Sequence, residues 1–222
     1  MSAATDAQGV LEVENLSVAT RDGVPLVDGV SFRLAPGERV ALIGSGSVLL
    51  DGVQVVGARE RDLVPLRGRV ASTVFQEPLT ALDPLMRVGQ QVAEPLRRHL
   101  GLRSDDLRRA VREALTEVGL PEPDLIARAY SWEISGGQRQ RVAIAAALAC
   151  RPRLLIADEP TTALDVTVQA DVLALLEKLV AERDMALLFV SHDLAVVSRM
   201  AQRALVLRQG RVVEEGPIAR LL

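Results

Sequence analysis

The chain has 222 residues, of which 49% are hydrophobic but only 2% aromatic, and its formal net charge is −3 at pH 7. This length and apolar content exclude a disordered tail and indicate one sizeable domain with a mainly aliphatic core, in which the few aromatic residues are isolated large fillers; the charge gives no general reason to bind nucleic acid. Cys150 is the single cysteine, which excludes an internal disulfide. No stretch approaches the ~20 apolar residues of a membrane helix or has the pattern of a signal peptide. We therefore expect a cytosolic protein.

Residues 11–34 contain two stretches in which apolar and polar residues alternate, separated by the turn-rich segment 21–25. This alternation predicts an antiparallel pair of strands. The next stretch, 39–44, is a nearly continuous apolar run that ends in a glycine. It has the form of a buried strand leading into a phosphate-binding loop, so Gly44 is a candidate for contact with a nucleotide.

The expected phosphate loop does not follow that strand. Such a loop reads G-x-x-x-x-G-K-[ST]: its glycines expose backbone N–H groups, its lysine reaches the β- and γ-phosphates, and its hydroxyl serves magnesium. This chain instead runs from Gly44 through Ser47 directly into 48–52, which predicts another strand and turn, and no lysine lies nearby.

Residues 70–75 predict a further strand, which delivers Gln76 to its end. Two helical stretches follow, 88–99 and 104–118, and the second has Ser104 as its expected N-cap. Arginines in this region are interspersed with acids, which favours a solvated face over a nucleic-acid surface.

The segment Ser135-Gly136-Gly137-Gln138 predicts the start of another helix. Ser135 and Gln138 have the spacing of a capping box, in which each side chain bonds to the backbone N–H of the other residue. Gly136 and Gly137 are poor helix formers, but without side chains they let a ligand approach N–H groups at the positive end of the helix dipole. The start of this helix is therefore expected to bind an anion. The helix is expected to run to Cys150 and to end before Arg151-Pro152, since the residue preceding a proline avoids helical geometry.

Residues 153–159 form a short apolar run that ends in two acids, the pattern of a strand covered on both faces in a parallel sheet. The carboxyl end of such a strand is where open α/β sheets bind ligands. Asp158 suits a magnesium ligand, directly or through water, and Glu159 suits the orientation of a water for attack on phosphorus. Each motif alone has an ordinary explanation, because Ser-Gly-Gly is a common turn and Asp-Glu often begins a solvated loop. Together they favour hydrolysis of a magnesium-bound nucleotide.

Asp165 is placed to cap a helix over 166–183, and 186–190 predicts the next buried strand, which leads to His192. A lone histidine is more often a structural hydrogen-bonding residue, but one in the same rim as two acids, at the carboxyl end of a central strand, can reach a γ-phosphate. The remaining predicted elements are a helix and a hairpin, at 194–201 and 204–216.

Four stretches, taken in chain order, closely resemble the motifs of the ATP-binding cassette (ABC) ATPases: the signature at 135–141, the Walker B strand at 154–159, the D-loop at 162–165 and the H-loop at 191–193. The stretch 75–84, which reads F-Q-E-P-L-T-A-L-D-P, further resembles the ATPases of dipeptide, oligopeptide and nickel importers.

The resemblance implies a single ABC ATPase domain over residues 1–222, with an α/β fold. Its parts are a P-loop NTPase-like parallel sheet core, an antiparallel β subdomain and a helical signature subdomain at about 85–150. In this family two such domains, identical or different, sandwich two ATP molecules with Mg²⁺. Each γ-phosphate then lies between the P-loop of one subunit and the helix start at Ser135-Gly136-Gly137-Gln138 of the other.

In that arrangement Glu159 polarises the attacking water and His192 holds the γ-phosphate. Asp158 and Gln76 serve the metal, and Gln76 lies in a Q-loop that also approaches the attacking water. Asp165 belongs to the D-loop, which crosses to the second ATPase subunit. The resemblance further implies transmembrane permease subunits as partners, an extracytoplasmic solute-binding protein as an indirect one, and a position on the inner face of the cell membrane, with peptides, nickel or another small solute as cargo.

The chain departs from the family where roughly two to three dozen residues, a phosphate loop with the crossover helix that a parallel sheet requires, are missing between Gly44 and Val48. Three explanations are open: the sequence omits a segment, the gene product is a deletion, or the protein is a degenerate ATPase. The first is favoured, because the flanks and the later motifs are intact. As written, the 222-residue chain should not hydrolyse ATP, and under the third explanation it is a non-catalytic binding or regulatory subunit.

A second departure concerns the adenine base. The aromatic residue that stacks on adenine in the family is replaced by Ala19 or Thr20, so base binding should be weaker or less selective. A soluble ABC ATPase that acts on DNA or ribosomes shares the signature, but we expect such a protein to carry a long coiled-coil insertion or a second cassette, and this sequence contains neither.

Overall fold

The structure is a computed structural model that describes residues 11–19, 25–43, 64, 66–75, 82–161, 164–208 and 211–221. Its strands are β1 (Leu11–Ala19), β2 (Pro25–Leu34), β3 (Arg39–Ile43), β4 (Ala71–Val74), β5 (Leu154–Asp158), β6 (Ala186–Val190), β7 (Arg203–Arg208) and β8 (Arg211–Pro217). Its helices are α3 (Val88–Leu100), α4 (Ser104–Glu117), α5 (Pro123–Arg128), η1 (Ser131–Glu133), α6 (Gly136–Leu148), α7 (Val166–Glu182), α8 (Leu194–Met200) and α9 (Ile218–Leu221).

Six strands form one sheet in the order β4-β5-β6-β3-β7-β8. The first five are parallel to their neighbours, and β8 is antiparallel to β7. Strands β1 and β2 form a separate antiparallel sheet, in which Leu11 pairs with Leu34. The parallel core, the antiparallel pair and the terminal hairpin are those that the sequence predicts, because the continuous apolar runs become central strands and the alternating runs become antiparallel ones. Every residue of β6 is buried.

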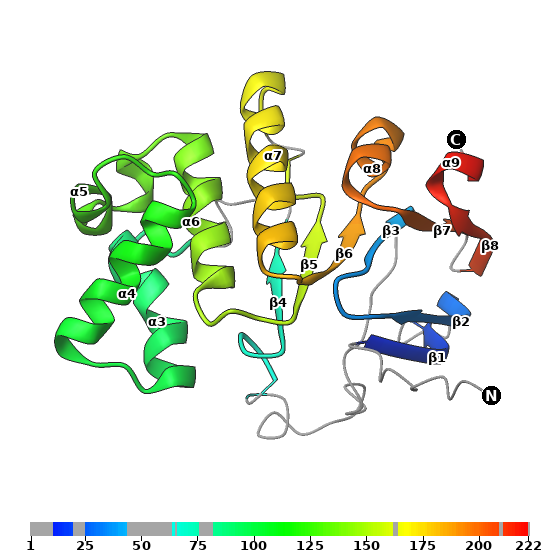
Figure 1. Cartoon of the computed structure of the whole chain (residues 1–222), viewed down its shortest axis with the longest axis horizontal. Helices are drawn as coiled ribbons and strands as arrows, with labels where there is room; N and C mark the ends of the chain where they lie inside the picture. The colour runs from blue at the N-terminus through cyan, green and yellow to red at the C-terminus, as the bar shows by residue number, and fades with distance from the viewer. Residues whose placement is uncertain are drawn as a thin grey trace, which may run out of the picture.

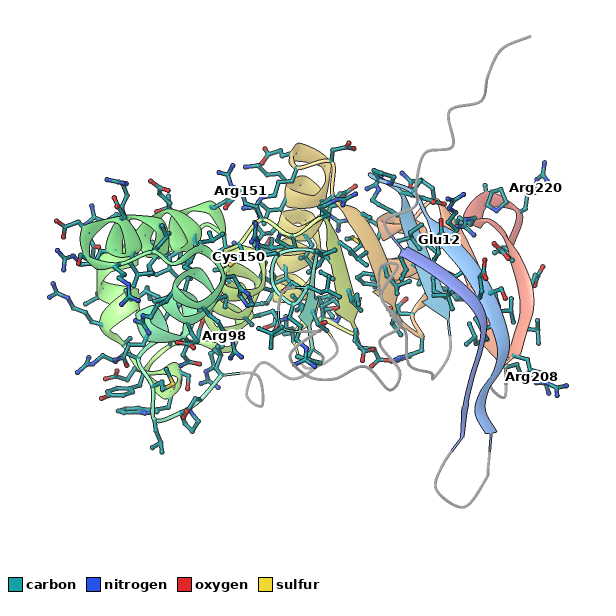
Figure 2. The ribbon with its side chains drawn as sticks, turned by 90° about the horizontal axis from the view of Figure 1, so that it is seen from below. Glu12, Arg98, Cys150, Arg151, Arg208 and Arg220 are labelled. Carbon is teal, nitrogen blue, oxygen red and sulfur yellow. The ribbon has the colours of Figure 1, made fainter. Side chains whose placement is uncertain are left out.

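The helices α3, α4, α5 and α6 gather at one end of the molecule, while α7 and α8 lie beside the sheet (Figure 1). The ribbon β1–β2 lies at the opposite end from Arg98, a residue of α3 (Figure 2). Helix α6 connects these parts, since its Val142 and Ile144 belong to the same buried cluster as Phe189 of β6 and Leu176 of α7. The position of the signature segment is therefore fixed by packing against both the helical group and the layer around the sheet.

The structure corrects some expectations about helices. Ser104 is the first residue of α4 rather than its N-cap, and the cap position is held by Arg103 without a side-chain hydrogen bond. The first turn of α4 instead carries Asp105 and Asp106, which suit the positive end of a helix dipole. Helix α6 ends at Leu148, two residues before the predicted end; α5 and η1 lie within the predicted helical subdomain at about 85–150 without ranges of their own, and α9 is not among the predicted elements.

The aromatic residues divide between core and surface. Phe32 and Phe189 are buried, as the composition predicts. Phe75 and Trp132, however, are 57% and 65% exposed, so the expectation that they fill the core is wrong. Trp132 stacks instead on Tyr130, with the ring centroids 5.7 Å apart.

Within the described part of the chain, no helix has both the length and the apolar character needed to cross a bilayer.

Candidate functional site

Three parallel strands end together at one edge of the sheet. Leu42 of β3 and Asp158 of β5 both pair with Val190, the last residue of β6. The backbone N–H of Glu159 donates to the carbonyl oxygen of Val190 over 2.9 Å, which extends this contact one residue past β5. The edge therefore brings Asp158, Glu159 and the chain leading to His192 together, at the place where open α/β sheets bind ligands.

Glu159 and His192 form a hydrogen-bonded pair at this edge. His192 Nδ1 lies 2.5 Å from Glu159 Oε1. The pKa of His192 is raised, first because of this hydrogen bond and then because of the negative charge of Glu159. His192 is held between the end of β6 and the start of α8, where Asp193 Oδ1 accepts from the backbone N–H of Ala195. The two side chains therefore lie together at the carboxyl end of the parallel strands, as the sequence predicts.

The backbone of Glu159 adopts a left-handed conformation, with φ of 43°. This conformation is unfavourable for a residue with a side chain, by about 1–2 kcal/mol, and it persists only where the surroundings hold it. Here the N–H bond to Val190 holds one side of the residue, and Pro160 follows directly on the other. Such strain is common where a side chain must point in a particular direction at a functional site.

Asp158 is exposed at the end of β5. Partial burial of its carboxyl raises its pKa, and repulsion from the neighbouring Glu159 raises it further. A cation at this edge would relieve both effects, so the donor fits Mg²⁺, an ion that binds through one or two carboxylates and keeps several waters or phosphate oxygens. In the described ranges, no group of three or more His, Cys, Asp or Glu side chains could hold a metal ion. Gln76, the second metal candidate, lies outside the described residues.

The helix start at α6 has the predicted capping box. Ser135 Oγ accepts from the backbone N–H of Gln138 over 3.2 Å, and the N–H of Ser135 donates to Gln138 Oε1 over 2.9 Å. The two glycines differ in their surroundings. A Cβ on Gly136 would meet no atom within 4 Å, whereas one on Gly137 would lie 2.8 Å from Cγ1 of Val168 in α7. Gly136 is therefore open to a ligand, while Gly137 also permits close packing of α6 against α7.

Asp165 is the N-cap of α7, as predicted, and its Oδ1 accepts from the backbone N–H of Val168 over 3.0 Å. Gly44, which follows β3, lies outside the described residues, as does 162–163 of the predicted D-loop. The described site thus contains two groups, the Asp158–Glu159–His192 edge and the start of α6.

Sequence reasoning missed a residue that joins these two groups. Gln140 of α6 is fully buried, and its Nε2 donates to the carbonyl oxygen of Pro160 over 2.6 Å. The sequence contains a pattern that indicates the importance of Gln140: it lies on the same face of the helix as Ile144 and Leu148, which are both buried. A polar residue in an apolar row indicates a specific hydrogen bond.

Comparison with protein families matches residues 44–162 to the family described as ABC transporter. The peptidoglycan transport ATP-binding protein YejF of Agrobacterium fabrum is 42% identical over 245 residues, covering 98% of this chain and 45% of YejF. The oligopeptide transport ATP-binding protein AppD of Bacillus subtilis is 38% identical over 237 residues, covering 94% of this chain and 72% of AppD. The chain therefore spans less than half of YejF and most of AppD.

Both alignments are longer than the 222-residue chain itself, so each relative contains residues within the aligned region that this chain lacks. Among solved structures, the fold is similar to the dimeric ATP-binding cassette MJ0796 in a post-hydrolysis state bound to ADP and Pi. The TM-score is 0.79 at 27% identity, over 94% of this chain and 98% of that one.

Proposed function

Because the chain belongs to the ABC transporter family, we propose that it is the ATP-hydrolysing subunit of an importer for peptides or a related small solute. The family and the fold predicted from the sequence are both confirmed. The observation that carries the proposal is the Glu159–His192 pair, which lies at the sheet edge where β3 ends and where the family's phosphate loop begins. AppD is an oligopeptide transport ATP-binding protein and YejF a peptidoglycan transport ATP-binding protein, and both names support a peptide-like cargo.

In this proposal Glu159 orients a water molecule for attack on the γ-phosphate. The water oxygen bonds to the γ-phosphorus as the bond from phosphorus to the ADP oxygen breaks, and the Glu159 carboxylate accepts the proton that the water loses. His192 holds the carboxylate through Nδ1. When the ring is protonated, a form that the raised pKa of His192 favours, its other nitrogen, Nε2, also carries a hydrogen and donates a hydrogen bond to the γ-phosphate.

Asp158 and Gln76 are proposed to hold Mg²⁺ together with the phosphates. When bound, the ion would neutralise the negative charge that develops on the phosphate oxygens. The carboxylate of Asp158 must be ionised for this role, and its raised pKa still leaves that form available once a cation is near, because an opposite charge lowers the pKa of a carboxyl.

Two copies of the cassette, or this chain and a related one, are proposed to share two ATP molecules. Ser135, Gly136 and Gln138 at the start of α6 would face the γ-phosphate held by the other subunit, and the open space above Gly136 supports this arrangement. MJ0796 is dimeric, which supports it further. Permease subunits are the proposed membrane partners, a solute-binding protein an indirect one, and the inner face of the cell membrane the proposed location.

We further propose that a phosphate loop belongs between Gly44 and Val48 in the complete protein. The longer alignments with both relatives support this proposal, as does the register of β3, which would place the loop beside Val190 and the acidic edge. Trypsin cleaves after arginine, so the sequence as written yields one peptide over 40–59. Detection of that uninterrupted peptide in protein from the native gene would contradict the proposal, and its absence beside the flanking peptides would support it.

The proposed function is tested by measuring phosphate release from ATP with protein purified from the native gene, with Mg²⁺ and with excess chelator. Magnesium-dependent release that is lost on Glu159→Gln supports the proposal. Release at the same rate in that variant assigns the activity to another site or to a contaminant.

A further inference from the structure

We propose that Gln140 is a positioning residue for hydrolysis, which acts by tying helix α6 to the turn that carries Glu159. The inference rests on the proposed function of Glu159. Its structural basis is the hydrogen bond from Gln140 Nε2 to the carbonyl oxygen of Pro160, the residue that directly follows Glu159.

Packing alone does not explain an amide at this position. Gln140 Oε1 is buried and has no hydrogen-bond partner among the described residues. An unsatisfied buried acceptor costs free energy, and an apolar side chain of the same shape would avoid that cost. The neighbours in its helical row, Ile144 and Leu148, are indeed apolar. The bond that the amide donates to Pro160 is therefore the contact that distinguishes it from an apolar side chain.

That bond holds the strained turn from the side of α6. The left-handed backbone of Glu159 needs support from its surroundings. The turn is bonded to β6 through the N–H of Glu159, to His192 through the Glu159 side chain, and to α6 through the bond from Gln140 to Pro160. Removing the bond from Gln140 detaches the turn from the side chain of Gln140 in α6, so the Glu159 carboxylate loses its fixed direction relative to that helix.

A second contact lies at the far end of the same loop. Gly137, one turn before Gln140, packs so closely on Val168 of α7 that a Cβ would approach Cγ1 to 2.8 Å. Helix α6 is thus attached to both ends of the segment 160–168, which contains the N-cap Asp165. The neighbouring Arg141 side chain bonds in the other direction, to the carbonyl oxygen of Val118. Gln140 is the residue of this turn whose side chain bonds toward the catalytic edge.

The test introduces Gln140→Met and Gln140→Asn into the protein from the native gene and compares each variant with that protein unchanged. Methionine keeps the length and removes the donor, whereas asparagine keeps the amide but is one methylene too short to reach Pro160. We expect kcat for ATP to fall roughly tenfold in both variants, with KM changed less than about twofold, because a misplaced catalytic group lowers the rate without weakening substrate binding. Two variants are used so that a failure of one to fold leaves the other as the test.

The matched control is Ile144→Val, which removes a methylene from the same buried row and leaves the bond to Pro160 intact. This variant should lower the melting temperature and leave kcat unchanged. A kcat within twofold of the parent in the folded Gln140 variants overturns the inference, and so does an equal loss of kcat in Ile144→Val, since either result reduces Gln140 to a packing role.

Hydrogen exchange provides a measurement that does not depend on activity. The amides of Glu159 and Thr161 should exchange faster in the Gln140 variants than in the parent, and at the parent rate in Ile144→Val. Unchanged exchange overturns the inference. If Glu159→Gln abolishes turnover while the Gln140 variants match the parent, only the positioning role of Gln140 fails. If the parent releases no phosphate, the proposed function fails. In that case hydrogen exchange alone decides whether Gln140 holds the turn.

Discussion

His192 Nδ1 and Glu159 Oε1 are hydrogen-bonded at 2.5 Å, between side chains that are 71% and 21% exposed. The bond connects the residue after β5 to the loop after β6, and it makes the ionisation of His192 depend on Glu159. The roles of the two residues can therefore be tested both by the rate of ATP hydrolysis and by the pKa of His192.

The first prediction concerns the titration of His192. Its folded pKa is raised above the ordinary value of about 6.5, so the charged pair stabilises the fold fully below pH ~6.5 and loses this contribution as the pH rises through the folded pKa. In metal-free protein, an NMR titration should give His192 a pKa above 6.5, and Glu159→Gln should lower it. His99, the only other histidine, is an internal reference: burial lowers its pKa, and the substitution should leave it unchanged. Equal His192 titrations in the two proteins would contradict the prediction.

The second prediction concerns turnover. Removing a general base typically lowers a rate by about 10²–10⁴-fold, and we expect Glu159→Gln to reduce phosphate release by at least ~100-fold. Dimerisation driven by ATP should persist, because the start of α6 is unchanged; sedimentation with ATP measures it. Glu177→Gln is the control, since Glu177 of α7 pairs with Arg199 of α8 and has no part in the proposed site. Loss of activity in both variants would indicate a general effect of charge rather than a role for Glu159.

The third prediction separates the two glycines of the signature. Gly136→Ala meets no atom within 4 Å, so it should keep or raise stability, by up to ~1 kcal/mol from helix propensity, while weakening ATP-driven dimerisation. Gly137→Ala places a methyl group 2.8 Å from Cγ1 of Val168 and should lower the melting temperature. Adding Val168→Ala should recover part of that loss. If Gly137→Ala is as stable as the parent, the close packing of α6 on α7 is wrong.

The fourth prediction concerns the cap of α7. Asp165 Oδ1 accepts from the N–H of Val168, and loss of such a cap costs about 1 kcal/mol. Asp165→Ala should lower the free energy of unfolding in urea by this amount, and Asp165→Asn, which can still accept the bond, should lower it by much less. An effect of Asp165→Asn on turnover with unchanged stability would support the proposed contact of the D-loop with a second subunit.

Sequence patterns predicted those parts of the site that depend on local chemistry. The capping box of Ser135 and Gln138 needs only two residues of one helix turn, and Asp165 caps its own helix. The apolar runs placed Asp158 and His192 at one edge, because parallel strands end together. These features are encoded within a few residues of where they occur.

Features that depend on distant packing were not predictable in this way. The neighbour of Gly137 is Val168, and the acceptor for Gln140 is the carbonyl oxygen of Pro160, 20 residues away. Neither follows from local propensity. The expected cap at Ser104 is wrong by one position: the serine is the first residue of α4, and Arg103 holds the cap position.

The last prediction tests the phosphate loop itself. Leu42 of β3 pairs with Val190, so a loop beginning at Gly44 would start beside the Glu159–His192 pair. Inserting a loop of the form G-x-x-x-x-G-K-[ST], followed by a helix, between Gly44 and Val48 should supply the N–H groups and the lysine that bind β- and γ-phosphates. By calorimetry with ATP and Mg²⁺, the 222-residue chain should bind at least ~10-fold more weakly than the chain with the insertion, since a lost charge-assisted contact costs about 1.5–3 kcal/mol. Replacing the inserted lysine by alanine is the control and should remove most of the gain. Equal affinity in all three proteins would mean that nucleotide binds elsewhere, and that the edge formed by β3, β5 and β6 is not the site of hydrolysis.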